Sequence, residues 1–231
     1  MQSIPHAENV KRLEVLRSFD VLDSAPEKSY DELTRLTAEL CEAPVCLISL
    51  VEKDRQWFKS EVGLGICETH IEQSICSHAV AQDNYLEIGD TVLDPRTVDN
   101  PLCMGKKPFR FYAGALIRSL DNWPLGTLCV LDYKPRRLSA QQQQILRVHA
   151  KSVAHQLELT RVLIKSVKSA TRKTPKTSVN ASILKRIDSL TPRETEIVQL
   201  IGSGSASLSS KKIARELNTV SYTHLTLPTK A

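Results

Sequence analysis

Long hydrophobic runs are missing from this sequence. No stretch approaches the roughly 20 consecutive apolar residues that a membrane-spanning helix needs, and residues 1–11 hold no apolar core of a secretory signal. The sequence therefore predicts a cytoplasmic protein without a membrane partner. Hydrophobic residues still make up 41% of the 231 residues, which is enough for a folded core and argues against wholesale disorder.

Motifs of catalysis and of metal binding are also missing. The sequence has no Walker loop, Ser/His/Asp grouping or paired-carboxylate motif, so we expect no enzymatic activity. The cysteines form no Cys-x-x-Cys pair and lack the Cys/His spacing of a zinc site, and we predict no metal and no cofactor. Because most have apolar neighbours, we expect them to be small core residues. The six are Cys41, Cys46, Cys67, Cys76, Cys103 and Cys129.

The charge of the chain is modest but uneven. The net charge is +5, basic residues outnumber acidic ones over residues 161–215, and the region before Glu87 is mildly acidic. A basic C-terminal part fits a partner with a phosphate backbone. A solvated linker has the same composition, so charge alone does not decide between the two.

The spacing of apolar and turn-forming residues predicts an α+β domain over residues 1–160, with an antiparallel sheet flanked by helices. Helices are expected over residues 10–19, 30–41 and 74–81, the second with helical spacing of Leu33, Leu36, Thr37 and Leu40. Strands are expected over residues 44–51, 55–62, 85–88, 110–118 and 125–133. The first two strands are predicted to form a hairpin whose turn is 52–54.

A long helix is predicted to begin after Ser139, which forms a capping box with Gln142, and to run to about Val167. Its apolar residues alternate in spacings of four and three, as in a heptad seam. The seam is Leu146, Ala150, Val153, Leu157, Thr160, Ile164 and Val167. We expect the first half to pack on its own domain and the second half to form a homodimer, so that the helix Ser139–Val167 carries the dimer contact.

Six segments of the first 160 residues resemble, in their order and spacing, a GAF domain. They are Leu22-Asp23-Ser24, Asp54-Arg55-Gln56-Trp57-Phe58-Lys59, Ser74-Ile75-Cys76-Ser77-His78-Ala79, Asp94-Pro95-Arg96, Phe111-Tyr112-Ala113-Gly114-Ala115 and Leu125-Gly126-Thr127-Leu128-Cys129-Val130. The resemblance implies a sensor that binds an unknown small molecule or a protein partner on one face of its sheet. Gly114 and Gly126 are expected where strands bend or approach closely.

Transferred to this sequence, the ligand pocket of the family lies among Phe58, Cys76, His78 and Tyr112. A purely structural role for Cys76 and His78 is the alternative, since buried histidines are often only hydrogen-bonded. A bilin on Cys76 is disfavoured, because phytochrome-type GAF domains have His directly after the Cys and Ser77 intervenes here. The Asp54-Arg55 pair is interpreted as turn and surface charge.

The sharpest motif of the chain lies in residues 183–219. Leu190-Thr191-Pro192-Arg193-Glu194 combines an N-cap, a proline at the first helical position and a capping box, and a helix follows over Lys211–Leu217. Together they resemble the first part of a LuxR-type helix-turn-helix, which implies DNA as a partner. By this resemblance Lys211, Lys212 and Arg215 contact phosphates. A helical hairpin that only caps the sensor is the alternative.

Two further segments complete the predicted organisation. Residues 161–182 hold the end of the long helix and a basic linker around Pro175. Residues 220–231 have no helical apolar face, depart from the family's reading helix and look like a translated sequencing adapter, so we expect them not to be native. A natural divergent tail is the alternative.

These features predict a GAF-containing transcriptional regulator that couples sensing to a truncated DNA-binding head. One rival hypothesis is a sensory adaptor that acts through protein contacts alone. Another is a cysteine redox sensor or reductase, which needs a reactive thiolate beside a resolving cysteine. The sequence lacks the His-Ile-Ala-Cys-Asp segment and the Ser-rich stretch expected of GAF-like methionine sulfoxide reductases, which disfavours the reductase.

Overall fold

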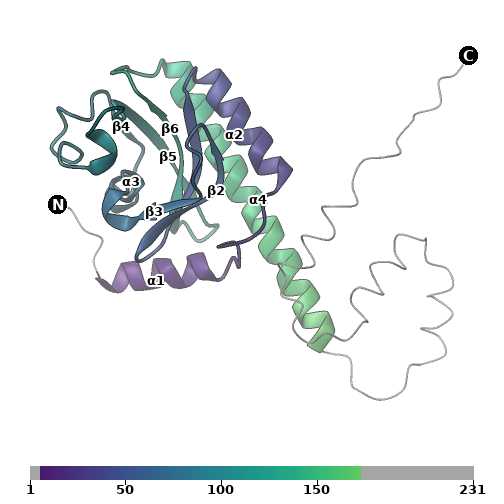
Figure 1. Ribbon diagram of the computed structural model, residues 1–231. Helices are drawn as coiled ribbons and strands as arrows, with labels where there is room; N and C mark the ends of the chain where they lie inside the picture. The colour runs from purple at the N-terminus through teal and green to yellow at the C-terminus, as the bar shows by residue number, and fades with distance from the viewer. Residues whose placement is uncertain (1–5, 173–231) are drawn as a thin grey trace, which may run out of the picture. The chain divides into compact units, whose positions relative to one another are not determined.

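The computed structural model describes residues 6–172, and its strands form one six-stranded antiparallel sheet in the order β3-β2-β1-β6-β5-β4 (Figure 1). The strands are β1 Val45–Val51, β2 Arg55–Val62, β3 Glu68–His70, β4 Leu86–Ile88, β5 Phe111–Arg118 and β6 Pro124–Asp132. The helices are α1 His6–Arg17, α2 Lys28–Leu40, α3 Cys76–Gln82 and α4 Ala140–Arg172, with short 3-10 helices Ile71–Gln73 and Pro101–Cys103. Among residues 6–172, no helix is long and apolar enough to cross a membrane.

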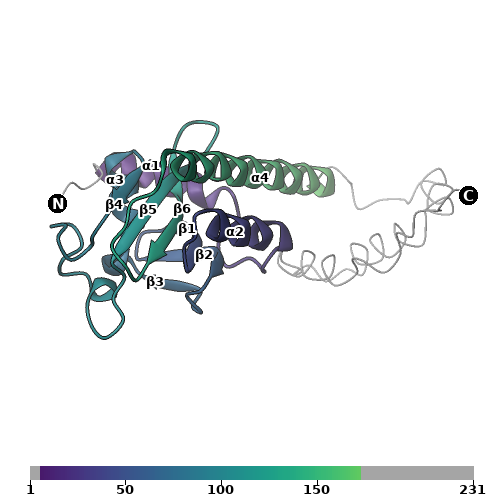
Figure 2. The same cartoon turned by 90° about the horizontal axis from the view of Figure 1, so that it is seen from above.

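Both faces of the sheet are covered, which explains why β1 is almost entirely apolar. Residues Cys46, Ile48 and Leu50 face the layer of α1, α2 and α4, while Val45 and Leu47 face α3. Alternate residues of a strand point to opposite faces, so a strand buried on both sides is mostly apolar, and Ser49 is the one polar residue of β1. Figures 1 and 2 both show α2 and α4 side by side, with α3 across the sheet.

Helix α4 begins as the sequence predicts. The backbone N–H of Gln142 donates to Ser139 Oγ at 3.2 Å, and the backbone N–H of Ser139 donates to Gln142 Oε1 at 3.1 Å, which confirms the capping box. The first four seam residues, Leu146, Ala150, Val153 and Leu157, are all buried in the sensor core. The helix continues to Arg172, past the predicted end at Val167.

Three details of the sequence prediction are wrong. Leu36 and Leu40 are exposed, whereas Thr34 and Thr37 lie in the core, because each threonine donates its hydroxyl to the carbonyl four residues earlier and is thereby satisfied. Cys67 is exposed, unlike the other five cysteines. The edge strand β3 was not predicted, since its three residues Glu68–His70 are too short and polar to show a pattern.

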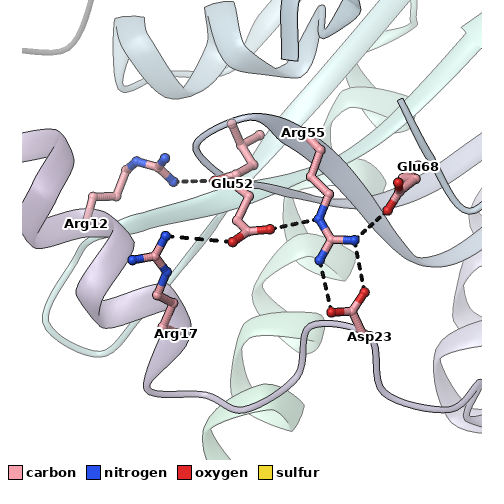
Figure 3. A network of polar contacts seen from close by, with 7 residues as sticks. Arg12, Arg17, Asp23, Glu52, Arg55 and Glu68 are labelled. Atoms are coloured by element: carbon pink, nitrogen blue, oxygen red, sulfur yellow. Dashed lines mark hydrogen bonds and ion pairs between the residues drawn. The ribbon is translucent and has the colours of Figure 1, made fainter. Parts of the chain in front are cut away.

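Arg55 is the centre of an ion-pair network and not simply a surface charge, as Figure 3 shows. Its guanidinium donates to both oxygens of Asp23 at 2.9 and 3.0 Å, to Glu52 at 2.8 Å and to Glu68. The bidentate pair with Asp23 and then the bond to Glu52 raise the pKa of Arg55. One cation thus joins the α1–α2 connection, the β1–β2 turn and the edge strand β3.

Replacing Arg55 with Gln should destabilise the domain by about 2 kcal/mol, because three converging carboxylates lose their common cation. The free energy of unfolding from urea titration at low salt measures this. The matched control is Arg35→Gln, which breaks an exposed pair with Glu39 on α2 and should change stability by less than about 0.5 kcal/mol. Equal effects of the two variants would show that Arg55 is an ordinary surface charge.

Candidate functional site

The face of the sheet under α3 collects most of the predicted ligand residues. Phe58 from β2, Cys76 from α3 and Tyr112 from β5 all belong to one buried cluster. His78 is also buried, with 9% of its surface exposed, but it lines a separate hollow on the outer side of α3. The predicted site therefore divides into a buried cluster beneath α3 and a hollow beside it.

A buried amide fixes the position of α3 over the sheet. Gln56 Oε1 accepts hydrogen bonds from Ser74 Oγ at 2.7 Å and from Ser49 Oγ at 3.4 Å, while Gln56 Nε2 donates to Thr69 Oγ1 at 2.6 Å. Ser74 Oγ in turn accepts from the backbone N–H of Ser77, in the first turn of α3. Because the side chains of Ser49, Gln56, Thr69 and Ser74 are buried, each needs its partner, and the network holds α3 in one position.

Two glycines make room for this arrangement. A Cβ at Gly126 would lie 1.9 Å from the backbone oxygen of Ser49, so β6 can approach β1 this closely only without a side chain. A Cβ at Gly114 would lie 2.3 Å from the hydroxyl of Tyr112, whose ring covers that position. The close approach expected at Gly126 is thus confirmed. At Gly114, the absence of a side chain leaves the space that the Tyr112 ring occupies.

Sulfur and hydroxyl groups meet at the centre of the buried cluster. The Sγ atoms of Cys76 and Cys129 are 3.7 Å apart, and Tyr112 Oη lies 3.5 Å from Thr127 Oγ1. Hydrogen bonding from Cys129, and then from Thr127 and Tyr112, lowers the pKa of Cys76. Burial raises the pKa of Cys129 and of Tyr112, so these two stay protonated.

The hollow beside α3 has a volume of about 600 Å³ and a polar lining. It is lined by Glu72, His78, Gln82, Pro95, Arg96, Asp99 and Asn100. Arg96 is held by Asp94 through Nε at 2.8 Å, and Asn100 Nδ2 donates to the carbonyl of Gln73 at 3.1 Å. Cationic, anionic and amide groups in one hollow suit a small polar ligand that makes several hydrogen bonds.

Arg96 and Asn100 line the hollow although neither is among the predicted site residues. Arg96 belongs to the Asp94-Pro95-Arg96 segment that carries the family resemblance, and Asn100 follows it in the same loop. Only the folded loop brings their side chains beside His78. In the sequence, the loop motif was the one feature that could have indicated a role in the site. Gln56 had no such signal beyond its place in a strand.

Comparison with known proteins decides the family. The model of the GAF domain family matches residues 25–157, more than half of the chain. The chain belongs to the GAF domain family. The GAF fold includes the sheet and α3, and the matched range ends at the last buried seam residue, Leu157.

Solved GAF domains share the fold at low sequence identity. The GAF domain of a phosphoenolpyruvate-protein phosphotransferase from Acinetobacter aligns with a TM-score of 0.50 and 14% identity, over 69% of this chain and 97% of that one. The PixJ GAF domain of Thermosynechococcus elongatus, in its blue-light absorbing form, aligns with a TM-score of 0.50 and 15% identity, over 75% and 100%. At these identities the likeness shows the fold alone.

A curated relative is more similar to this chain in sequence than these solved structures are. A cyclic di-GMP phosphodiesterase of Pseudomonas aeruginosa is 33% identical over 129 residues, which are 56% of this chain. The chain spans 22% of the length of that relative. The similarity therefore covers a GAF-sized part of a much longer protein.

The predicted DNA-binding residues Lys211, Lys212 and Arg215 lie outside the described residues. The same holds for the segments 183–219 and 220–231 and for the linker from residue 173 onward.

The state of His78 gives the site a pH dependence. Burial, and then the charge of Arg96, lower the pKa of His78 below that of an unfolded chain, so the folded protein holds it neutral. Stability is therefore full above the unfolded pKa of about 6.5 and is lost as the pH falls below it. His78→Gln should reduce this loss between pH 7 and pH 5, measured as the free energy of unfolding at each pH.

His149, whose pKa burial also lowers, keeps part of the pH dependence, so the effect of His78→Gln should be partial. The control is His155→Gln on the exposed side of α4, which should leave the pH dependence unchanged. A His78→Gln protein that loses stability with pH as steeply as the unaltered chain would contradict the assignment.

Proposed function

We propose that the protein is a GAF-containing transcriptional regulator, in which binding of a small polar molecule or a partner at the α3 face alters DNA binding by the C-terminal segment. The observation that carries the proposal is helix α4. It begins within the sensor core, through Leu146, Ala150, Val153 and Leu157, and continues without a break to Arg172. One helix therefore runs from the sensor core to Arg172, and the segment that resembles a helix-turn-helix follows it along the chain.

Contacts near the end of the buried stretch support a route for the signal. Glu158 Oε1 accepts a hydrogen bond from the backbone N–H of Leu120 at 2.9 Å, in the turn between β5 and β6. Glu158 also pairs with Arg161, whose guanidinium lies over the ring of Phe19 after α1. A change in the sheet or in α1 would thus reach α4 directly. Such coupling requires two discrete states of the helix.

The homodimer is part of the proposal and is limited to the later part of α4. The first four seam residues are used by the sensor core, so they are not free to meet a second chain. Leu159, Val162, Leu163 and Val167 are exposed and offer the apolar surface for such a contact. The exposed residues only partly follow the predicted heptad seam, which shifts the expected dimer contact to a different stripe of the helix.

The DNA-binding head rests on sequence alone, on Leu190–Glu194 and the basic helix Lys211–Leu217. The proposal places the protein in the cytoplasm with its DNA partner, and it assigns a regulatory and not a catalytic role. The activity in the name of the Pseudomonas aeruginosa phosphodiesterase belongs to that longer protein. The sensory adaptor stays as the second hypothesis, and the DNA experiment separates the two.

The 231-residue chain should bind duplex DNA weakly and in a salt-dependent manner, since Lys211, Lys212 and Arg215 contact phosphates without reading bases. Binding is measured by fluorescence anisotropy of a labelled duplex between 50 and 200 mM salt, concentrations chosen for the expected counterion release. Changing all three residues to Ala should reduce the slope of log K against log salt by up to about 3.

The control removes the same charge from the exposed surface of the sensor, by Lys53→Ala, Lys106→Ala and Lys134→Ala. This variant should keep the slope of the unaltered chain. If the chain shows no salt-dependent binding, or if both triple variants behave alike, the DNA-binding role fails and the adaptor hypothesis is favoured.

A further inference from the structure

Two cysteines from distant parts of the chain meet beneath α3. Cys76 is the first residue of α3 and Cys129 lies in the middle of β6, yet their Sγ atoms are 3.7 Å apart. Both side chains are buried, with exposed fractions of 2% and 0%. Since a disulfide has an S–S length of about 2.05 Å, the sulfur atoms must approach by less than about 2 Å to form one.

The surroundings of this pair differ from those of an ordinary buried thiol. Three hydroxyl-bearing side chains, Ser49, Tyr112 and Thr127, lie around Cys76, and the thiol of Cys129 is 3.7 Å from its sulfur. These donors lower the pKa of Cys76 to about 6, with Cys129 as the largest contributor, although burial opposes the shift. A thiolate, and not a thiol, is the reactive form of cysteine.

The opposite face of the sheet provides a comparison within the same molecule. Cys41 and Cys46 are also buried, and they lie close enough for the charge of one to raise the pKa of the other. Burial is the largest influence on both, and it raises the pKa of Cys41 to about 11 and that of Cys46 further. In this second pair the backbone of Leu47 and the charge of Arg136 also favour a thiolate, but burial outweighs them, whereas at Cys76 the donors outweigh burial.

We propose that Cys76 and Cys129 form a redox-active dithiol, which a hydroperoxide converts to an intramolecular disulfide. The thiolate of Cys76 attacks one oxygen of hydrogen peroxide, the O–O bond breaks, and the departing hydroxide takes up a proton to become water. Cys76 is then a sulfenic acid. The sulfur of Cys129 attacks that of Cys76, the S–S bond forms, and the second hydroxide leaves as water after taking the thiol proton.

The step balances, because two thiols and one hydrogen peroxide give one disulfide and two water molecules. Hydrogen peroxide is close to water in size and reaches the buried thiols when α3 opens locally. The new bond ties the first turn of α3 to the centre of the sheet, beside the Gln56 network and the His78 hollow. Oxidation would thus be a second signal that acts on the α3 face, besides the proposed ligand or partner. It does not depend on the proposed DNA binding.

The test uses the 231-residue chain with Cys67→Ser, which removes the exposed cysteine and with it disulfides between chains. Of the six cysteines five then remain. After mild peroxide treatment, alkylation of the denatured protein should find two fewer free thiols, and peptide mapping should find Cys76 joined to Cys129. Dithiothreitol should restore both thiols.

Single variants identify the attacking and the resolving sulfur. In Cys129→Ser, dimedone should label a sulfenic acid at Cys76, whereas in Cys76→Ser residue 129 should stay reduced. Cys46→Ser, in the comparison pair, should still form the Cys76–Cys129 disulfide. Thermal unfolding of each variant checks that it is folded. The disulfide mapping of the Cys67→Ser chain does not depend on these variants. Five free thiols after peroxide, or a disulfide between Cys41 and Cys46 instead, would overturn the proposal.

Discussion

The packing of α4 on the sheet is the contact on which the rest of the structure depends. Leu146, Val153 and Leu157 are nearly or fully buried there, and burying a side chain of this size is worth about 1.5–3 kcal/mol. Ala150 between them is buried in the same core cluster. The same layer holds α1 and α2, and α2 meets α4 through the hydrogen bond between Thr37 and His149. Because α4 is part of the core, it cannot shift without disturbing the sheet.

The other face of the sheet has a different chemistry. Its centre is polar yet buried, with Gln56, Ser49 and Thr127 beside the thiols of Cys76 and Cys129. A partly polar layer of this kind is held by specific hydrogen bonds, and one changed partner leaves another group unsatisfied. A ligand or an oxidant at this face would change these hydrogen bonds, while the apolar face would keep the domain folded.

Much of this fold could be predicted from the sequence. The long strands and α4 were predicted because apolar spacing and the Ser139 capping box are local signals. The features that were missed leave no apolar spacing in the sequence. The edge strand β3 is held by Arg55 and Gln56, and the core face of α2 uses threonines whose hydroxyls bind the helix backbone. The predicted ligand residues were found by resemblance, but their division between a buried cluster and an outer hollow follows from which side of α3 each one occupies.

Native-state hydrogen exchange is the most direct test of the central claim, that the first half of α4 and the sheet are one cooperative unit. Amides over residues 146–157 should exchange with the same opening free energy as those of β1 and β6, close to the free energy of global unfolding. Exchange of residues 146–157 through a separate opening of lower free energy, with β1 and β6 still protected, would contradict the account.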